Sequence, residues 1–134
     1  MNSTWTKQGM IQFLTIESHT CMEKAFVFHR QGLHKQSLTS VDQAIRCIFT
    51  ACYMKENETT LLKTHISDDE LFSTIRSHYH LDLNGDLLLS TACFLAEHYD
   101  LMIDQHQPSK EQIKNMLMKI TLLLEHIIRQ LLSA

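Results

Sequence analysis

The densest group of polar side chains in the sequence lies in the segment Arg76-Ser77-His78-Tyr79-His80. On a helix, Arg76 and His80 would lie one turn apart on the same face. An arginine can stabilise the charge that develops on phosphate oxygens, and a histidine can move the proton of a ribose 2′-hydroxyl without a metal. The pair is therefore a candidate for phosphodiester cleavage. Histidines near the end of a helix are also favoured by the helix dipole alone, and that structural role is the alternative.

A second polar group is Glu97-His98-Tyr99-Asp100, followed by His106. Adjacent residues on a helix point in different directions and cannot converge on one ion, so we predict no metal site. The sequence has no HExxH motif, no paired ExxH motifs and no glycine-rich phosphate loop, which excludes the enzyme classes that need them. We expect no cofactor. The predicted ligand-binding residues are Arg76, His78, His80, His98 and Tyr99.

The four cysteines, Cys21, Cys47, Cys52 and Cys93, form no CxxC pair and lie within helical patterns. We interpret them as reduced, small, buried apolar residues rather than as disulfides, zinc ligands or nucleophiles.

The composition is that of one folded domain, which we predict to span residues 1–134. Apolar residues make up 44% and charged residues 20% of the 134 residues, a balance that disordered chains do not show. Only three glycines and one proline occur, which favours long helices over a β-sandwich or barrel with many tight turns.

The charge and the apolar runs limit the possible partners and location. The formal net charge of −3 argues against broad binding of duplex DNA, although nine histidines could make the surface more positive in mildly acidic buffer. The first twenty residues show no signal-peptide pattern, and the apolar runs are far shorter than the ~20 residues of a membrane-spanning helix. We therefore expect a cytoplasmic protein without membrane contact.

Apolar residues at three- and four-residue steps predict a first helix over residues 7–30 and a second over 35–56. Gly32 is expected to end the first of these helices in the left-handed conformation. Together the two segments predict an antiparallel helical hairpin.

The second half of the chain predicts three more helices, after a polar loop over residues 55–64. Ser67 with Glu70 and Ser109 with Gln112 have the spacing of capping boxes, which start helices. The turn signal Asn84-Gly85 places the start of another helix near residue 86, and its apolar pattern extends to about residue 103. The predicted fold is an all-α, up-and-down antiparallel bundle of about five helices.

The last helix carries more apolar surface than one packing face needs. Met116, Met118, Leu122, Leu123 and Leu132 widen its apolar stripe. Excess apolar surface commonly marks an interface, which predicts a homodimer. A central position of this helix within the bundle is the alternative explanation.

Four short segments, in this order of helices, resemble the HEPN family, the higher-eukaryote and prokaryote nucleotide-binding domains. The segments are Gly32-Leu33, Gln43-Ala44-Ile45, Lys63-Thr64-His65 and Leu95 to Tyr99. The resemblance covers nearly the whole chain. It implies a five-helix bundle, often dimeric, that is frequently encoded beside a small nucleotidyltransferase as a toxin–antitoxin pair or as a substrate-binding accessory.

Active HEPN members are metal-independent ribonucleases, whose motif is an arginine followed after four to six residues by a histidine. Here Arg76 and His80 are separated by three residues, as are Arg30 and His34. Related members carry Arg-Tyr-Pro before the last helix, where this chain has Gln105-His106-Gln107-Pro108. These departures favour a non-catalytic module that binds a nucleotide, RNA or a nucleotidyltransferase. The alternatives are a ribonuclease that uses Arg76 and His80, and a helical interaction or structural subunit without a ligand site.

Overall fold

The computed structural model describes residues 6–57, 66–102 and 107–133 and contains five α-helices. No strand occurs in these three ranges, so the all-α prediction is confirmed. A short 3-10 turn, η1, follows the fourth helix at Tyr99–Leu101. The α-helices are α1 (Lys7–Arg30), α2 (His34–Glu56), α3 (Asp68–His78), α4 (Leu83–His98) and α5 (Lys110–Leu132).

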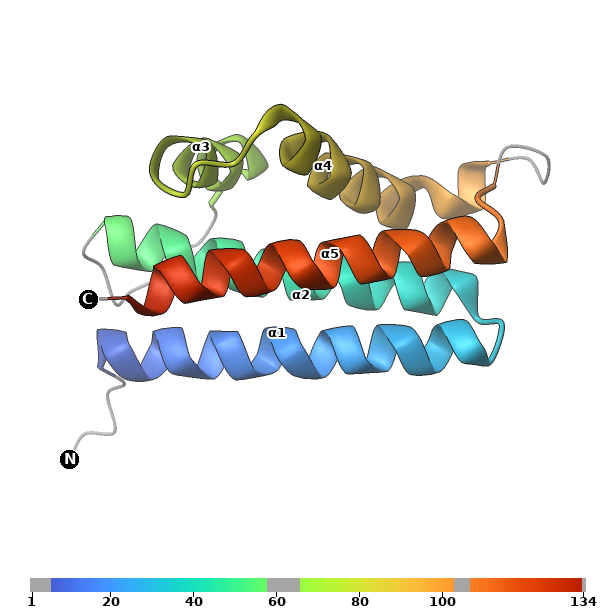
Figure 1. Cartoon of the computed structure of the whole chain (residues 1–134), viewed down its shortest axis with the longest axis horizontal. Helices are drawn as coiled ribbons and strands as arrows, with labels where there is room; N and C mark the ends of the chain where they lie inside the picture. Colours follow the sequence, from blue (N-terminus) through green and yellow to red (C-terminus); the bar gives the residue numbers. More distant parts are fainter. Residues whose placement is uncertain (1–5, 58–65, 103–106, 134) are drawn as a thin grey trace.

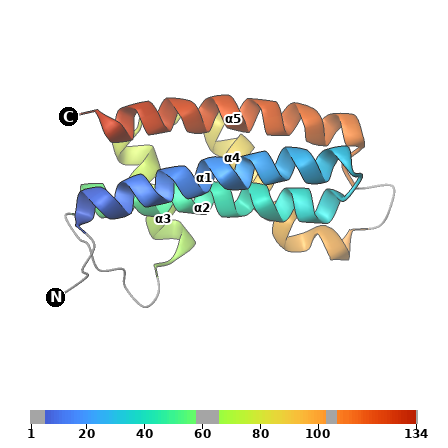
Figure 2. The ribbon, with the colours of Figure 1, turned by 90° about the horizontal axis from the view of Figure 1, so that it is seen from below.

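The helix α2 lies at the centre of the bundle, because it packs against each of the other four α-helices. Figure 1 shows α1 and α2 as an antiparallel hairpin, with α5 beside both and α3 and α4 on the opposite side from α1. Seen from below in Figure 2, α1, α2 and α5 run side by side along the long axis. The core follows from this arrangement: α2 contributes the fully buried Leu38, Val41, Ile45, Ile48 and Phe49.

Small residues allow α1 and α2 to approach closely along the hairpin. Ala25 and Ala44 are completely buried. Two buried serines bridge the helices: the Ser18 hydroxyl donates to the Ala44 carbonyl at 2.9 Å, and the Ser37 hydroxyl donates to the Ala25 carbonyl at 2.8 Å. Each serine therefore satisfies its hydroxyl inside the core without a water-accessible partner.

The end of α1 has the predicted glycine cap. Gly32 has a φ of +77°, the left-handed conformation that glycine adopts without steric cost. The Leu33 amide donates to the Phe28 carbonyl at 2.9 Å, and the Gly32 amide donates to the His29 carbonyl at 3.0 Å. These two bonds form a Schellman motif, which satisfies carbonyls at the end of the helix.

Both predicted capping boxes are confirmed. The Glu70 amide donates to the Ser67 hydroxyl oxygen at 3.2 Å, and the Ser67 amide donates to the Glu70 carboxylate at 3.2 Å. The same pair of bonds joins Ser109 and Gln112, at 3.1 and 2.8 Å. The helices α3 and α5 therefore begin where the sequence predicted.

The predicted start of α4 at residue 86, after an Asn84-Gly85 turn, is wrong. The helix begins at Leu83, because the Asp82 side chain caps it and accepts a hydrogen bond from the Gly85 amide at 2.7 Å. A Cβ at Gly85 would lie 2.8 Å from Leu81 Cδ1 and 3.3 Å from Leu123 Cδ2, so this glycine serves close packing. The helix ends at His98, and residue 103 lies outside the described ranges.

The predicted loop over residues 55–64 is only partly described. Lys55 and Glu56 belong to α2, and residues 58–64 lie outside the described ranges. The Lys55 ammonium donates to the Leu131 carbonyl at 2.7 Å and to the Ser133 carbonyl at 3.1 Å, so it joins the ends of α2 and α5.

Within the described part of the chain, no helix has the length and apolarity that crossing a bilayer requires.

Candidate functional site

Arg76, the first candidate residue, is bound to a carboxylate of the next helix. Its Nε donates to Asp86 Oδ2 at 2.8 Å, and its Nη2 donates to Asp86 Oδ1 at 3.2 Å. These bonds lower the pKa of the Asp86 carboxyl below its ordinary value. The guanidinium also lies 5.3 Å from the centre of the Phe72 ring. Arg76 therefore links α3 to α4, and two of its N–H groups are already bonded to Asp86.

The predicted relation between Arg76 and His80, one turn apart on a shared helix face, is wrong. The helix α3 ends at His78, and His80 follows outside the helix with a φ of +51°. Tyr79, the C-cap residue, holds this end of α3 against α2: it is 2% exposed, and its hydroxyl donates to Glu56 Oε2 at 2.9 Å. The chain must turn here, because α4 begins only a few residues later.

His78 shares Glu56 with Tyr79. Its Nδ1 lies 3.5 Å from Glu56 Oε1, and its side chain is about half exposed. The two neighbouring residues therefore fasten the end of α3 to the last turn of α2. This is a structural role, and it leaves one edge of the imidazole in solvent.

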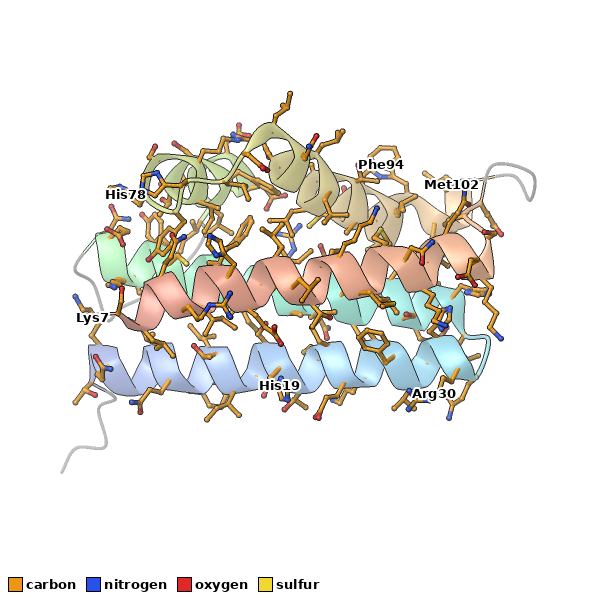
Figure 3. All side chains as sticks on the ribbon, in the orientation of Figure 1. Lys7, His19, Arg30, His78, Phe94 and Met102 are labelled. Carbon is orange, nitrogen blue, oxygen red and sulfur yellow. The ribbon has the colours of Figure 1, made fainter. Side chains whose placement is uncertain are left out.

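His98 and Tyr99 lie at the far end of α4 from this group. His98 is the last of the sixteen residues of α4, and fifteen steps of 1.5 Å place it about 22 Å from the first residue of the helix. Figure 3 labels His78 at one end of the molecule and Phe94 and Met102 toward the other. The five candidate residues consequently form two separate groups and do not line one cleft.

At its own end of α4, His98 stacks on Phe94 with the ring centres 4.4 Å apart. Its Nδ1 donates to the Phe94 carbonyl at 3.1 Å. The Tyr99 hydroxyl donates to Gln107 Oε1 at 3.4 Å, and the Gln107 amide donates to the Met102 carbonyl at 3.3 Å. Tyr99 and Gln107 therefore close the connection toward α5, while His98 extends an aromatic surface on the outside of α4.

The outer face of α4, which was not predicted from the sequence, carries uncovered apolar side chains. Leu83, Leu87 and Phe94 are 81%, 63% and 55% exposed. Beside them, α4 and α5 form an open groove of about 550 Å³. The signal was present in the sequence, because residues 87–89 and 92–96 place apolar side chains on every side of the helix. A helix that is apolar all round is normally covered on all sides.

The apolar surface of α5 is narrower than the sequence suggested. Met116 and Leu123 pack against the core, so they belong to the bundle interior. Met118, Leu122 and Leu132 remain exposed, with Leu122 at 67%. Packing of α5 within the bundle therefore explains two of the five apolar residues that widen its stripe. The other three remain exposed.

The cysteines are free thiols, and three of them are buried; Cys47 is half-buried. Burial raises the pKa of Cys52 and of Cys93 to about 12, and that of Cys47 to about 11. At neutral pH these groups are thiols rather than thiolates, which removes the nucleophilic form.

Over residues 6–57, 66–102 and 107–133, no three histidine, cysteine or acidic residues lie close enough to hold a metal ion.

The geometry thus offers anchored polar residues at the two ends of α4 and an uncovered apolar face between them. The HEPN-like segment Lys63-Thr64-His65 and residues 105 and 106 lie outside the described ranges. In comparisons with protein-family models, curated proteins and solved structures, the chain matches none of them, so the HEPN resemblance stays a prediction from the sequence.

Proposed function

We propose that this chain is a non-catalytic helical binding module, as the HEPN resemblance implies, and that it works as a homodimer joined by the outer faces of two α4 helices. The observation that carries the proposal is the uncovered apolar row of Leu83, Leu87 and Phe94. Large apolar side chains gathered on one face of a folded domain mark an interaction surface.

The spacing of this row favours a second copy of the chain as the occupant. Leu83, Leu87, Phe94 and His98 follow one another at steps of four, seven and four residues, which read the same in both directions. Two such helices paired antiparallel around a two-fold axis near Ser90 and Thr91 would match Leu87 with the partner subunit's Phe94, twice. A two-fold interface requires this kind of self-complementary surface.

The middle of the row permits close approach of the two helices. Ser90 and Thr91 are small, and Ser90 is half-buried beside Asp86, to which its hydroxyl donates at 3.3 Å. Bulky side chains therefore lie toward the ends of the row, with small residues at its centre. This distribution suits helices that cross at their midpoints.

Size-exclusion chromatography with light scattering tests the dimer. We expect the wild-type protein to have twice the mass of the chain, and Leu87→Glu to be a folded monomer, because two carboxylates would be buried in the interface. The matched control is Leu122→Glu on α5, which changes a leucine of almost equal exposure. It should remain dimeric.

Two outcomes contradict this interface. A monomeric wild-type protein at high micromolar concentration would exclude the second copy and leave a foreign protein, such as a nucleotidyltransferase, as the partner. Loss of the dimer in Leu122→Glu but not in Leu87→Glu would transfer the interface to α5.

The non-catalytic part of the proposal rests on Arg76. Two of its donors are held by Asp86, and His80 lies beyond the end of α3, so the pair has no shared helix face. We expect structured RNA to remain intact when it is incubated with the protein in EDTA. Cleavage that disappears in His80→Ala would overturn this expectation and support the ribonuclease alternative.

A further inference from the structure

An open pocket of about 660 Å³ lies where the end of α1 meets the start of α5, away from the α4 face. In Figure 3, Arg30 is labelled at this end of α1. The volume falls in the range of small-molecule sites, roughly 300–1,000 Å³. The pocket is lined by Phe26, His29, Arg30, Lys110, Glu111 and Lys114.

A buried histidine fixes the two helices that form this pocket. His29 is 5% exposed, and its Nε2 lies 2.9 Å from the Lys110 carbonyl oxygen. Because a carbonyl can only accept, Nε2 must carry the hydrogen in this bond. Phe26 is half-buried and packs against the core beside it. The pocket therefore has an anchored wall that includes an aromatic ring.

The charged side chains of the pocket are predominantly basic. Arg30, Lys110 and Lys114 contribute three cations, against the one carboxylate of Glu111. Within the described residues, no carboxylate lies in ion-pair distance of these three cations, whereas Arg46 and Arg76 are each bound to aspartates. The single carboxylate offsets only part of the three positive charges, and a bound anion would reduce the repulsion that remains.

We propose that this pocket binds a small organic phosphate, whose flat apolar group contacts Phe26 and whose phosphate lies among Arg30, Lys110 and Lys114. Guanidinium and ammonium groups form short, charge-assisted hydrogen bonds with phosphate oxygens. An aromatic ring offers a face on which a planar group can stack. The pocket combines these two kinds of contact, so a ligand that carries both chemistries should bind better than either part alone.

Isothermal titration calorimetry with three probes tests this combination: adenosine monophosphate, adenosine and inorganic phosphate. We expect saturable binding of adenosine monophosphate at low ionic strength, with the other two probes weaker by about tenfold or more, equivalent to at least about 1.4 kcal/mol. Equal affinity of inorganic phosphate would contradict the role of Phe26. Absence of any saturable binding up to millimolar concentration would overturn the site.

Charge-reversal variants locate the binding. Arg30→Glu and Lys114→Glu should each weaken adenosine monophosphate by about tenfold, because each replaces an attractive charge with a repulsive one. Lys24→Glu changes the net charge by the same amount on an exposed part of α1 that does not line the pocket, so it should leave the affinity nearly unchanged. An equal loss in Lys24→Glu would show attraction by net charge alone and would contradict the site.

One variant tests the contact with Phe26, and another tests whether ligand binding is independent of the dimer. Phe26→Leu should weaken adenosine monophosphate and leave inorganic phosphate unaffected, provided that circular dichroism shows an unchanged fold. The monomeric Leu87→Glu variant should still bind adenosine monophosphate, because α4 does not line this pocket. Failure of the dimer and failure of the pocket are therefore separate results.

Discussion

Replacing Phe49 with alanine is expected to lower the free energy of unfolding by about 3–5 kcal/mol. Phe49 is 1% exposed in the second half of α2, and its ring meets the Phe72 ring edge to face with the ring centres 4.8 Å apart. Removal of the ring leaves a cavity between α2 and α3 that the surrounding helices cannot fill. Since small domains are stable by only about 5–15 kcal/mol, this loss is a large part of the total.

Urea unfolding followed by circular dichroism measures the loss. The control is Ile16→Ala on the exposed surface of α1, which removes an apolar side chain that is 66% exposed. We expect the control to change the unfolding free energy by no more than about 0.5 kcal/mol. Similar losses in the two variants would show that α3 does not pack on α2 as described.

Replacing Ala25 with leucine is expected to destabilise the protein by about 1–3 kcal/mol through overpacking. Ala25 is completely buried, and its carbonyl accepts the Ser37 hydroxyl of α2 at 2.8 Å. A larger side chain must push α1 away from α2, which also stretches this hydrogen bond. The effect arises from the close spacing of the hairpin rather than from a lost contact.

Lys24→Leu is the matched control for that prediction. It introduces the same side chain one residue earlier on α1, at an exposed position. Its unfolding midpoint should stay close to that of the wild-type protein, because leucine and lysine have similar helix propensities. Should Ala25→Leu be as stable as Lys24→Leu, the two helices would have to be farther apart than the serine bridges indicate.

Local signals predicted the first hairpin and the starts of two later helices. The apolar repeat of α1 and α2 is long, and Gly32 lies where a left-handed residue is required. Ser67 and Ser109 bind amides three residues away, so their capping geometry is encoded within one helical turn. These features need no knowledge of the rest of the chain.

The start of α4 was predicted wrongly because two local signals overlap there. Asn84-Gly85 is typical of a turn, but in the structure the Asp82 side chain caps a helix that already includes both residues. A Cβ at Gly85 would also lie 3.3 Å from Leu123 Cδ2 on α5, so the glycine permits close packing of residues far apart in the sequence. The segment therefore carries two competing local signals, and the sequence pattern alone did not rank the helix cap above the turn.

The candidate residues were correctly recognised as polar and clustered in sequence, but their positions in space were not predictable. The partner of Arg76 lies on the next helix, and Tyr79, at the end of α3, binds Glu56 on α2. The uncovered face of α4 was predictable in principle, because its apolar residues surround the helix. It was missed because excess apolar surface was considered only for the last helix.

The directions of α2 and α5 impose a topological requirement on the chain. The two helices contact each other and run parallel in Figures 1 and 2, and Lys55 joins their C-terminal ends. Parallel neighbours cannot be connected by a tight turn, since the chain must first return along the length of the molecule. The antiparallel α4 provides that return path, so a shortened chain without it would need a long, entropically costly linker to bring α5 into register.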